Sequence, residues 1–246
     1  VLLFYFVSFY ALREFMTLTP TRRSDYPALV AAFYFALPMQ YLLIALGWYG
    51  LFAIFIPVYL FLLIPFGLLM LGETKGFIRA VGSYQWATMT TVFAISHVAY
   101  LLMLPAEENP AGGGVGLVIY LVFLTQFNDV AQYIWGKKFG NRKIVPAISP
   151  NKTWAGFLGG VATTTLFGAL LAPWLTPLPW WLGLGAGLLI GLAGFIGDLT
   201  VSAVKRDLRI KDTSQLIPGH GGILDRIDSL MYTAPLFFHF LVYTTY

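Results

Sequence analysis

The chain has 246 residues, of which 58% are hydrophobic and 11% charged, and its mean hydropathy is +0.75. A soluble domain carries about a quarter charged residues, so this composition excludes a soluble globule and predicts an all-α, polytopic membrane protein. The chain has no cysteine, which excludes disulfides and cysteine nucleophiles and leaves carboxylates as ligands for a hard cation such as Mg²⁺. We attribute the net charge of +4 to membrane topology and expect no nucleic-acid partner.

Eight apolar segments approach the roughly 20 residues that a helix needs to cross a bilayer core of about 30 Å. They are residues 1–16, 27–46, 51–71, 86–104, 115–135, 154–172, 181–197 and 229–246. The first segment starts at Val1 without an initiator Met or a basic flank, so we expect the native N-terminus to be missing. We divide the chain into N-terminal helices, 1–114, and a C-terminal region, 115–246, which carries the polar loop 198–228.

The basic residues indicate how the segments are oriented. If the eight segments alternate in direction, the loops on one side hold 14 of the 15 basic residues. These are Arg22, Arg23, Lys75, Arg79, Lys137, Lys138, Arg142, Lys143, Lys152, Lys205, Arg206, Arg209, Lys211 and Arg226. The positive-inside rule predicts that this side faces the cytoplasm. We expect the membrane to be a bacterial inner membrane.

Small residues recur at four-residue spacing in two of the predicted helices. Gly183, Gly187 and Gly191 form one stripe, and Gly156 and Gly160 form another. Such stripes allow close approach of neighbouring helices, so we interpret both as helix-packing faces rather than functional sites.

Three carboxylates flank the polar loop 198–228. Asp198 is predicted to close the seventh helix, and Asp225 and Asp228 to open the eighth, which places all three at a similar depth. Asp225 and Asp228 are three residues apart and share a helix face, where a divalent cation would relieve their repulsion. Capping of a helix N-terminus is the simpler alternative for this pair.

Phosphate-binding chemistry is indicated by several features around these carboxylates. They are the glycine-rich run Pro218–Gly222 with His220, the cations Lys152, Lys205, Arg206, Lys211 and Arg226, and Asp129 within the apolar fifth segment. Glycines permit close approach to a phosphate, and an ionisable residue in a membrane helix is a functional candidate. A solvated basic loop with one polar helix contact explains each feature singly but not all of them together. Together they predict phosphoryl or nucleotidyl transfer at the membrane surface.

Eleven residues fit the pattern S-x-x-K-R-x-x-x-x-K-D followed by H-G-G-x-x-D-R-x-D. They are Ser202, Lys205, Arg206, Lys211, Asp212, His220, Gly221, Gly222, Asp225, Arg226 and Asp228. Upstream, the likeness extends to Asn128, Asp129, Tyr133, Gly136, Gly140, the stretch SPNKTW at 149–154, Gly197 and Asp198. With these motifs the chain resembles the phosphatidate cytidylyltransferase family, also called CDP-diacylglycerol synthase, over roughly residues 120–246.

The resemblance implies transfer of CMP from CTP to phosphatidic acid, with Mg²⁺ and a second, monovalent cation such as K⁺. It implies that Asp198 and Asp225 hold the metal ions and that Asp228 and Asp129 support them. The resemblance also implies catalytic roles for Lys205 and Lys211 beside Asp198, Asp225 and Asp228, and both lysines would also contact phosphate. The residues that it implies bind substrate are Asp129, Lys152, Ser202, Arg206, Asp212, His220, Gly221, Gly222 and Arg226. A homodimer is a further expectation from the family.

The chain departs from the family pattern at three positions. The family often has Glu where this chain has Ala155 and Val201, and usually has Gly where it has Arg209. The alternatives are therefore a low-activity or inactive paralogue that binds lipid or nucleotide, and, ranked lower, a transporter, prompted by Asp129 and the proline-interrupted helices. A transferase that consumes CDP-diacylglycerol is disfavoured, because the chain lacks the D-G-x-x-A-R pattern of that group.

Overall fold

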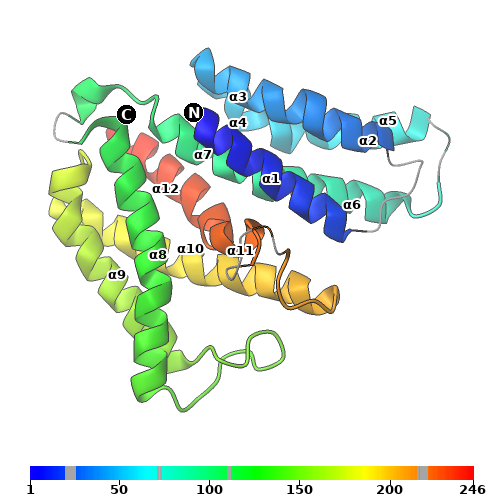
Figure 1. Cartoon of the computed structure of the whole chain (residues 1–246). Helices are drawn as coiled ribbons and strands as arrows, with labels where there is room; N and C mark the ends of the chain where they lie inside the picture. The colour runs from blue at the N-terminus through cyan, green and yellow to red at the C-terminus, as the bar shows by residue number, and fades with distance from the viewer. Residues whose placement is uncertain (20–25, 71, 73, 110–111, 215, 217–220) are drawn as a thin grey trace. The chain divides into compact units, whose positions relative to one another are not determined.

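The computed structural model describes residues 1–19, 26–70, 72, 74–109, 112–214, 216 and 221–246. Helices dominate this part of the chain, which confirms the predicted all-α class (Figure 1). Within it, β pairing is limited to one isolated bridge between Lys143 and Thr153. The chain divides into two compact units, Val1–Met103 with Thr213–Leu224 and Leu104–Asp212 with Asp225–Tyr246. The division predicted at residue 114 stays a proposal.

Four continuous helical segments make up most of the first unit, and three of them contain a π-helical stretch. The elements are α1 Leu2–Leu18; α2 Tyr26–Ala31, η2 Ala32–Ala36 and α3 Leu37–Ala45; α4 Tyr49–Ile54, η3 Phe55–Leu60 and α5 Phe61–Met70; α6 Phe77–Ala87, η4 Thr88–Phe93 and α7 Ala94–Leu101. Pro57 lies inside η3. Proline has no backbone N–H to donate, and the irregular hydrogen bonding of a π-helical stretch tolerates this missing donor. Phe52 and Tyr84 are among the largest fully buried side chains of this unit.

Three long helices and a shorter one form the second unit. After the short turn η5 Ala106–Glu108 come α8 Gly113–Phe139, α9 Trp154–Leu175, α10 Trp180–Asp207, α11 Leu224–Ile227 and α12 Leu230–Thr245. α9 packs against both α8 and α10, and α12 packs against α10 and α8 (Figure 1). The polar ends of α8 and α10 and the loop just before α9 carry six of the predicted site residues, namely Asp129, Asp198, Ser202, Lys205, Arg206 and Lys152, and the others follow α10 in the chain.

The predicted glycine stripes are confirmed as packing faces. A Cβ added at Gly187 of α10 would lie 2.7 Å from the carbonyl oxygen of Thr164 in α9, a separation that real Cβ atoms do not show. A Cβ added at Gly156 of α9 would likewise lie 2.6 Å from the carbonyl oxygen of Gln132 in α8. The backbones of the three long helices therefore pack without side chains between them at these points.

Within the described residues, five helical segments are long and apolar enough to cross a membrane. They are Tyr26–Ala45, Tyr49–Met70, Gly113–Phe139, Trp154–Leu175 and Trp180–Asp207. The predicted count of eight is not confirmed and stays a prediction. α1 and α12 have 17 and 16 residues, short of the roughly 20 that a crossing needs, and the helical segment 77–101 contains polar side chains such as Gln85 and His97.

The end of the seventh predicted segment needs correction. We expected Asp198 to close the helix and the loop to begin there, but α10 continues to Asp207. It then ends in a Schellman motif, in which the N–H of Arg209 donates to Arg206 O at 3.1 Å and the N–H of Ile210 donates to Lys205 O at 2.9 Å. Hydropathy shows where the apolar residues end, whereas the helix itself ends only at the Schellman motif, ten residues further along.

Candidate active site

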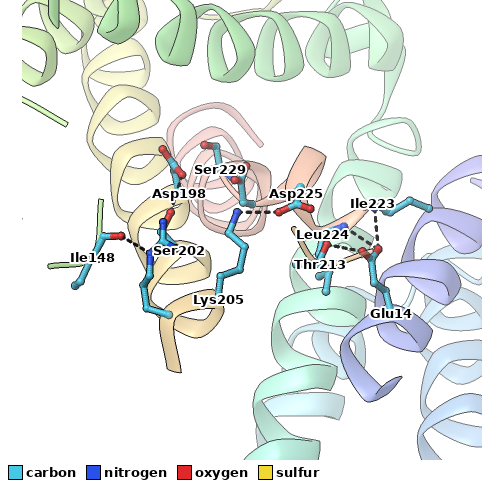
Figure 2. Close-up of polar contacts among 12 residues, drawn as sticks. Glu14, Ile148, Asp198, Ser202, Lys205, Thr213, Ile223, Leu224, Asp225 and Ser229 are labelled. Atoms are coloured by element: carbon cyan, nitrogen blue, oxygen red, sulfur yellow. Dashed lines mark hydrogen bonds and ion pairs between the residues drawn. The ribbon is translucent and has the colours of Figure 1, made fainter. Parts of the chain in front are cut away.

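One face of the polar end of α10 presents a carboxylate, a hydroxyl and a cation. Asp198, Ser202 and Lys205 are spaced by four and three residues, so they lie along the same side of the helix. The Ser202 hydroxyl donates to Asp198 Oδ1 at 3.3 Å (Figure 2). Because the helix does not stop at residue 198, these side chains are held on a rigid element and not on a loop.

Two lysines neutralise the two carboxylates that were predicted to bind metal. Lys152 Nζ lies 2.6 Å from Asp198 Oδ2. Lys205 Nζ lies 2.8 Å from Asp225 Oδ1 (Figure 2). The Asp225 side chain is only 8% exposed, and the other three are between 16% and 22% exposed. Pairs at this depth are screened by solvent less than surface pairs, so they persist at physiological salt.

Two further carboxylates lie close to this pair of lysines. Asp129 Oδ2 accepts from the Ser229 hydroxyl at 3.0 Å, while its buried Oδ1 has no hydrogen-bond partner among the described residues. Asp228 accepts from the N–H of Ser229 at 2.7 Å. Burial, followed by the negative charge of Asp198, raises the pKa of Asp228 from 3.8 to about 7, and the charge of Asp129 adds to this effect. The cluster therefore has unbalanced negative charge.

The carboxylates of this cluster are suited by their chemistry to bind a cation, although they are not arranged around a single point. The unpartnered Asp129 Oδ1 and the raised pKa of Asp228 both indicate a place where positive charge would stabilise the protein. Within the part of the chain that the structure describes, no three Asp, Glu or His side chains are grouped closely enough to hold one ion. Asp198 and Asp225 would have to exchange their lysines for the ion.

A polar pocket of about 580 Å³ opens beside Asp129 and Asp198 in the second unit. Its volume is within the range of roughly 300–1,000 Å³ typical of small-molecule sites. The lining comprises Asp129, Gln132, Tyr133, Gly136, Lys137, Lys143, Ser149, Asn151, Lys152, Thr153, Gly156, Phe157 and Asp198. Three lysines among these residues make the pocket suitable for an anionic ligand.

The loop before α9 positions Lys152. Thr153 caps α9, since its Oγ1 accepts from the N–H of Gly156 at 3.2 Å. Lys152 Nζ also donates to Gln132 Oε1 at 3.0 Å, and the buried Nε2 of Gln132 has no hydrogen-bond partner. Lys152 therefore connects α8 with α10 at the pocket wall.

The structure places the other predicted residues less centrally. Arg206 Nε donates to Ile148 O at 3.1 Å and so fastens the loop before α9. Lys211, Asp212 and Arg226 are exposed. Asp225 lies within α11, but Asp228 lies beyond its end at Ile227, so the two aspartates do not share one continuous helix as predicted. Gly221 has a φ of +78°, which favours glycine, and His220 lies outside the described residues.

Three polar residues with evident structural roles were not identified from the sequence alone. Ser229 contacts Asp129, and Gln132 contacts Lys152. Glu14 of α1, in the first unit, is 5% exposed and accepts hydrogen bonds from the segment 213–224. The signal for Glu14 was available, because an acidic residue in an apolar helix is a functional candidate by default.

The apolar helical segments and the pocket with its lysines and paired carboxylates fit an integral membrane enzyme that binds an anionic substrate. Residues 1–244 match the cytidylyltransferase family, and the chain belongs to that family.

Individual relatives are similar over different shares of the chain. Uncharacterized protein YnbB of Escherichia coli K12 is 46% identical over 99% of this chain and 79% of its own length. The phosphatidate cytidylyltransferase of Synechocystis is 51% identical over 46% of this chain and 39% of its own length. The enzyme of that name from Staphylococcus aureus strain COL is 37% identical over 62% of this chain and 59% of its own length.

Proposed function

We propose that the chain transfers CMP from CTP to phosphatidic acid, giving CDP-diacylglycerol and pyrophosphate. A phosphate oxygen of phosphatidic acid attacks the α-phosphorus of CTP, and the bond from that phosphorus to the oxygen bridging it to the β-phosphate breaks. The bonding electrons leave with pyrophosphate. The observation that carries the proposal is the pair of lysine–aspartate contacts, Lys152–Asp198 and Lys205–Asp225, in one charged cluster that also contains Asp129 and Asp228.

In this proposal Asp198 and Asp225 hold Mg²⁺, Asp129 and Asp228 support it, and a monovalent cation such as K⁺ binds nearby. A bound Mg²⁺ would offset charge on the phosphate oxygens and on the leaving pyrophosphate. With Asp198 and Asp225 holding the ion, Lys152 and Lys205 would contact phosphate. The phosphate of phosphatidic acid is already ionised near neutral pH, so the chain needs no strong general base.

The remaining predicted residues complete the proposed substrate contacts. Ser202 orients Asp198 through its hydrogen bond, and Arg206 keeps the loop before α9 beside the pocket. Lys211 and Arg226 are exposed cations that we propose contact the triphosphate or the lipid headgroup, and Asp212, His220, Gly221 and Gly222 belong to the same proposed substrate-binding set. We further propose that the site faces the cytoplasm at a bacterial inner membrane and that the protein forms a homodimer.

The proposal is tested by assaying purified protein in detergent for Mg²⁺-dependent conversion of CTP and phosphatidic acid to CDP-diacylglycerol. Asp225→Asn should lower turnover by at least about a hundredfold, the scale on which removing one electrostatic group from an active site reduces kcat. Asp207→Asn is the matched control, because it makes the same change at an exposed carboxylate at the end of α10. Equal losses in the two variants, or product formation without Mg²⁺, would contradict the proposal.

Absence of product in a preparation that still binds CTP would favour the inactive paralogue. Ala155→Glu would then be the informative change, since Ala155 lies in the first turn of α9, where a carboxylate is favoured by the helix dipole. Val201→Glu is less clean, because Val201 is 3% exposed and a carboxylate there would be forced into an apolar interior.

A further inference from the structure

A buried carboxylate in the first unit contacts part of the signature motif. Glu14 lies near the end of α1 and is only 5% exposed. Acidic side chains are almost never buried to this extent unless they are partnered. The partners of Glu14 therefore indicate what the residue does.

Among the residues that the structure describes, the segment 213–224 supplies hydrogen-bond donors to Glu14. Its Oε2 accepts from the backbone N–H of Ile223 at 2.8 Å and of Leu224 at 3.2 Å, and its Oε1 accepts from the Thr213 hydroxyl (Figure 2). Thr213 begins this segment and Leu224 ends it, so one carboxylate ties both ends to α1. We call Glu14, Thr213, Ile223 and Leu224 the Glu14 clasp.

The clasp also gives a physical reason for one glycine of the signature. A Cβ at Gly222 would overlap Glu14 Oε1 and Thr213 Oγ1. Gly222 is not among the residues with positive φ, so its backbone conformation is open to any residue. Space for the Glu14 carboxylate, and not backbone conformation, is what requires glycine at position 222.

We infer that Glu14 is a positioning residue that fixes the backbone of the signature segment leading directly into Asp225. Two of its hydrogen bonds hold the N–H groups of the two residues immediately before Asp225. Peptide planarity leaves few free torsions between a fixed Leu224 and its neighbour, so restraint of one restrains the other. The inference rests on the proposed function to the extent that Asp225 is taken as a metal ligand.

The clasp is tested first without any assay of activity. Hydrogen–deuterium exchange of peptides covering 213–224 should be about tenfold or more faster in Glu14→Ala, because losing hydrogen bonds to a carboxylate makes local opening of the segment easier. The exchange rate of Glu14→Gln should lie between those of the wild type and Glu14→Ala, since the Gln amide keeps one acceptor oxygen and replaces the other with a donor. Glu107→Gln is the matched control, an exposed glutamate outside the segment. Unchanged exchange in both Glu14 variants would overturn the inference.

Positioning is then separated from simple stabilisation by kinetics and metal binding. In Glu14→Ala, kcat should fall about tenfold or more while the KM for CTP changes less than about twofold, with partial recovery in Glu14→Gln. Mg²⁺ affinity should fall in the same order, and this readout still decides the question if the proposed transferase activity is absent. Faster exchange with normal Mg²⁺ affinity would show that Glu14 only stabilises the segment, and it would overturn the positioning role.

Discussion

Arg209 adopts a left-handed backbone conformation, which residues other than glycine disfavour. It occupies the left-handed position of the Schellman motif that ends α10, with a φ of +56°. Arg209→Gly should stabilise the protein by about 0.5–1 kcal/mol, because removing the Cβ strain outweighs the extra entropy of glycine in the unfolded chain. Thermal unfolding in detergent measures the gain. Arg209→Ala should give none, and an equal gain from alanine would show that the arginine side chain is responsible.

Asp228 should make stability depend on pH. Its folded-state pKa of about 7 lies above the ordinary 3.8, so between these values the folded protein holds a proton that the unfolded chain has released. That stabilisation is complete below pH 3.8 and is lost as the pH rises through 7. Without divalent ions, wild-type protein should therefore lose more stability between pH 5 and pH 8 than Asp228→Asn. Identical pH profiles would contradict this assignment, as would an absence of Mg²⁺ stabilisation at pH 8.

At the scale of elements, the glycine contacts between α9 and α10 should limit substitution sharply. Gly187→Ala should cost about 1–3 kcal/mol, because the added methyl meets backbone that cannot rotate away. Gly185→Ala on the same helix is the control, since its nearest neighbour is the Phe240 ring at 3.4 Å. Chemical or thermal unfolding of the two variants gives the comparison, and equal stabilities would show that the helices can separate freely.

The helices and their glycine faces could be predicted because apolar runs and four-residue spacing are local features of the sequence. The end of α10 could not, since the polar residues 198–207 remain helical through backbone bonding that hydropathy does not report. The site was predicted by residue type, but its pairing was not. Substrate binding by Lys152 stays a prediction, and its contact with Asp198 was not predicted. Glu14 has hydrogen-bond partners 199 to 210 positions away in the sequence.

At the scale of the whole molecule, topology can be measured directly because the chain has no cysteine. Lys211→Cys and Glu107→Cys introduce single thiols at exposed positions expected on opposite sides of the membrane. A membrane-impermeant maleimide should label Glu107→Cys in intact spheroplasts and Lys211→Cys only in inverted vesicles. Labelling of both from one side would remove the basis for a cytoplasmic site and require a different number of crossings.

The lengths of α8 and α10 bear on how a lipid would reach the pocket. With 27 and 28 residues they extend about 40 Å, some 10 Å beyond the hydrocarbon core. Asp198 and Lys205 lie in the last third of α10, at its polar end. Under the proposed function, phosphatidic acid would arrive and its product depart by lateral diffusion. The rate would then follow the mole fraction of phosphatidic acid in the membrane, and dilution with inert lipid would slow the enzyme even at constant total substrate.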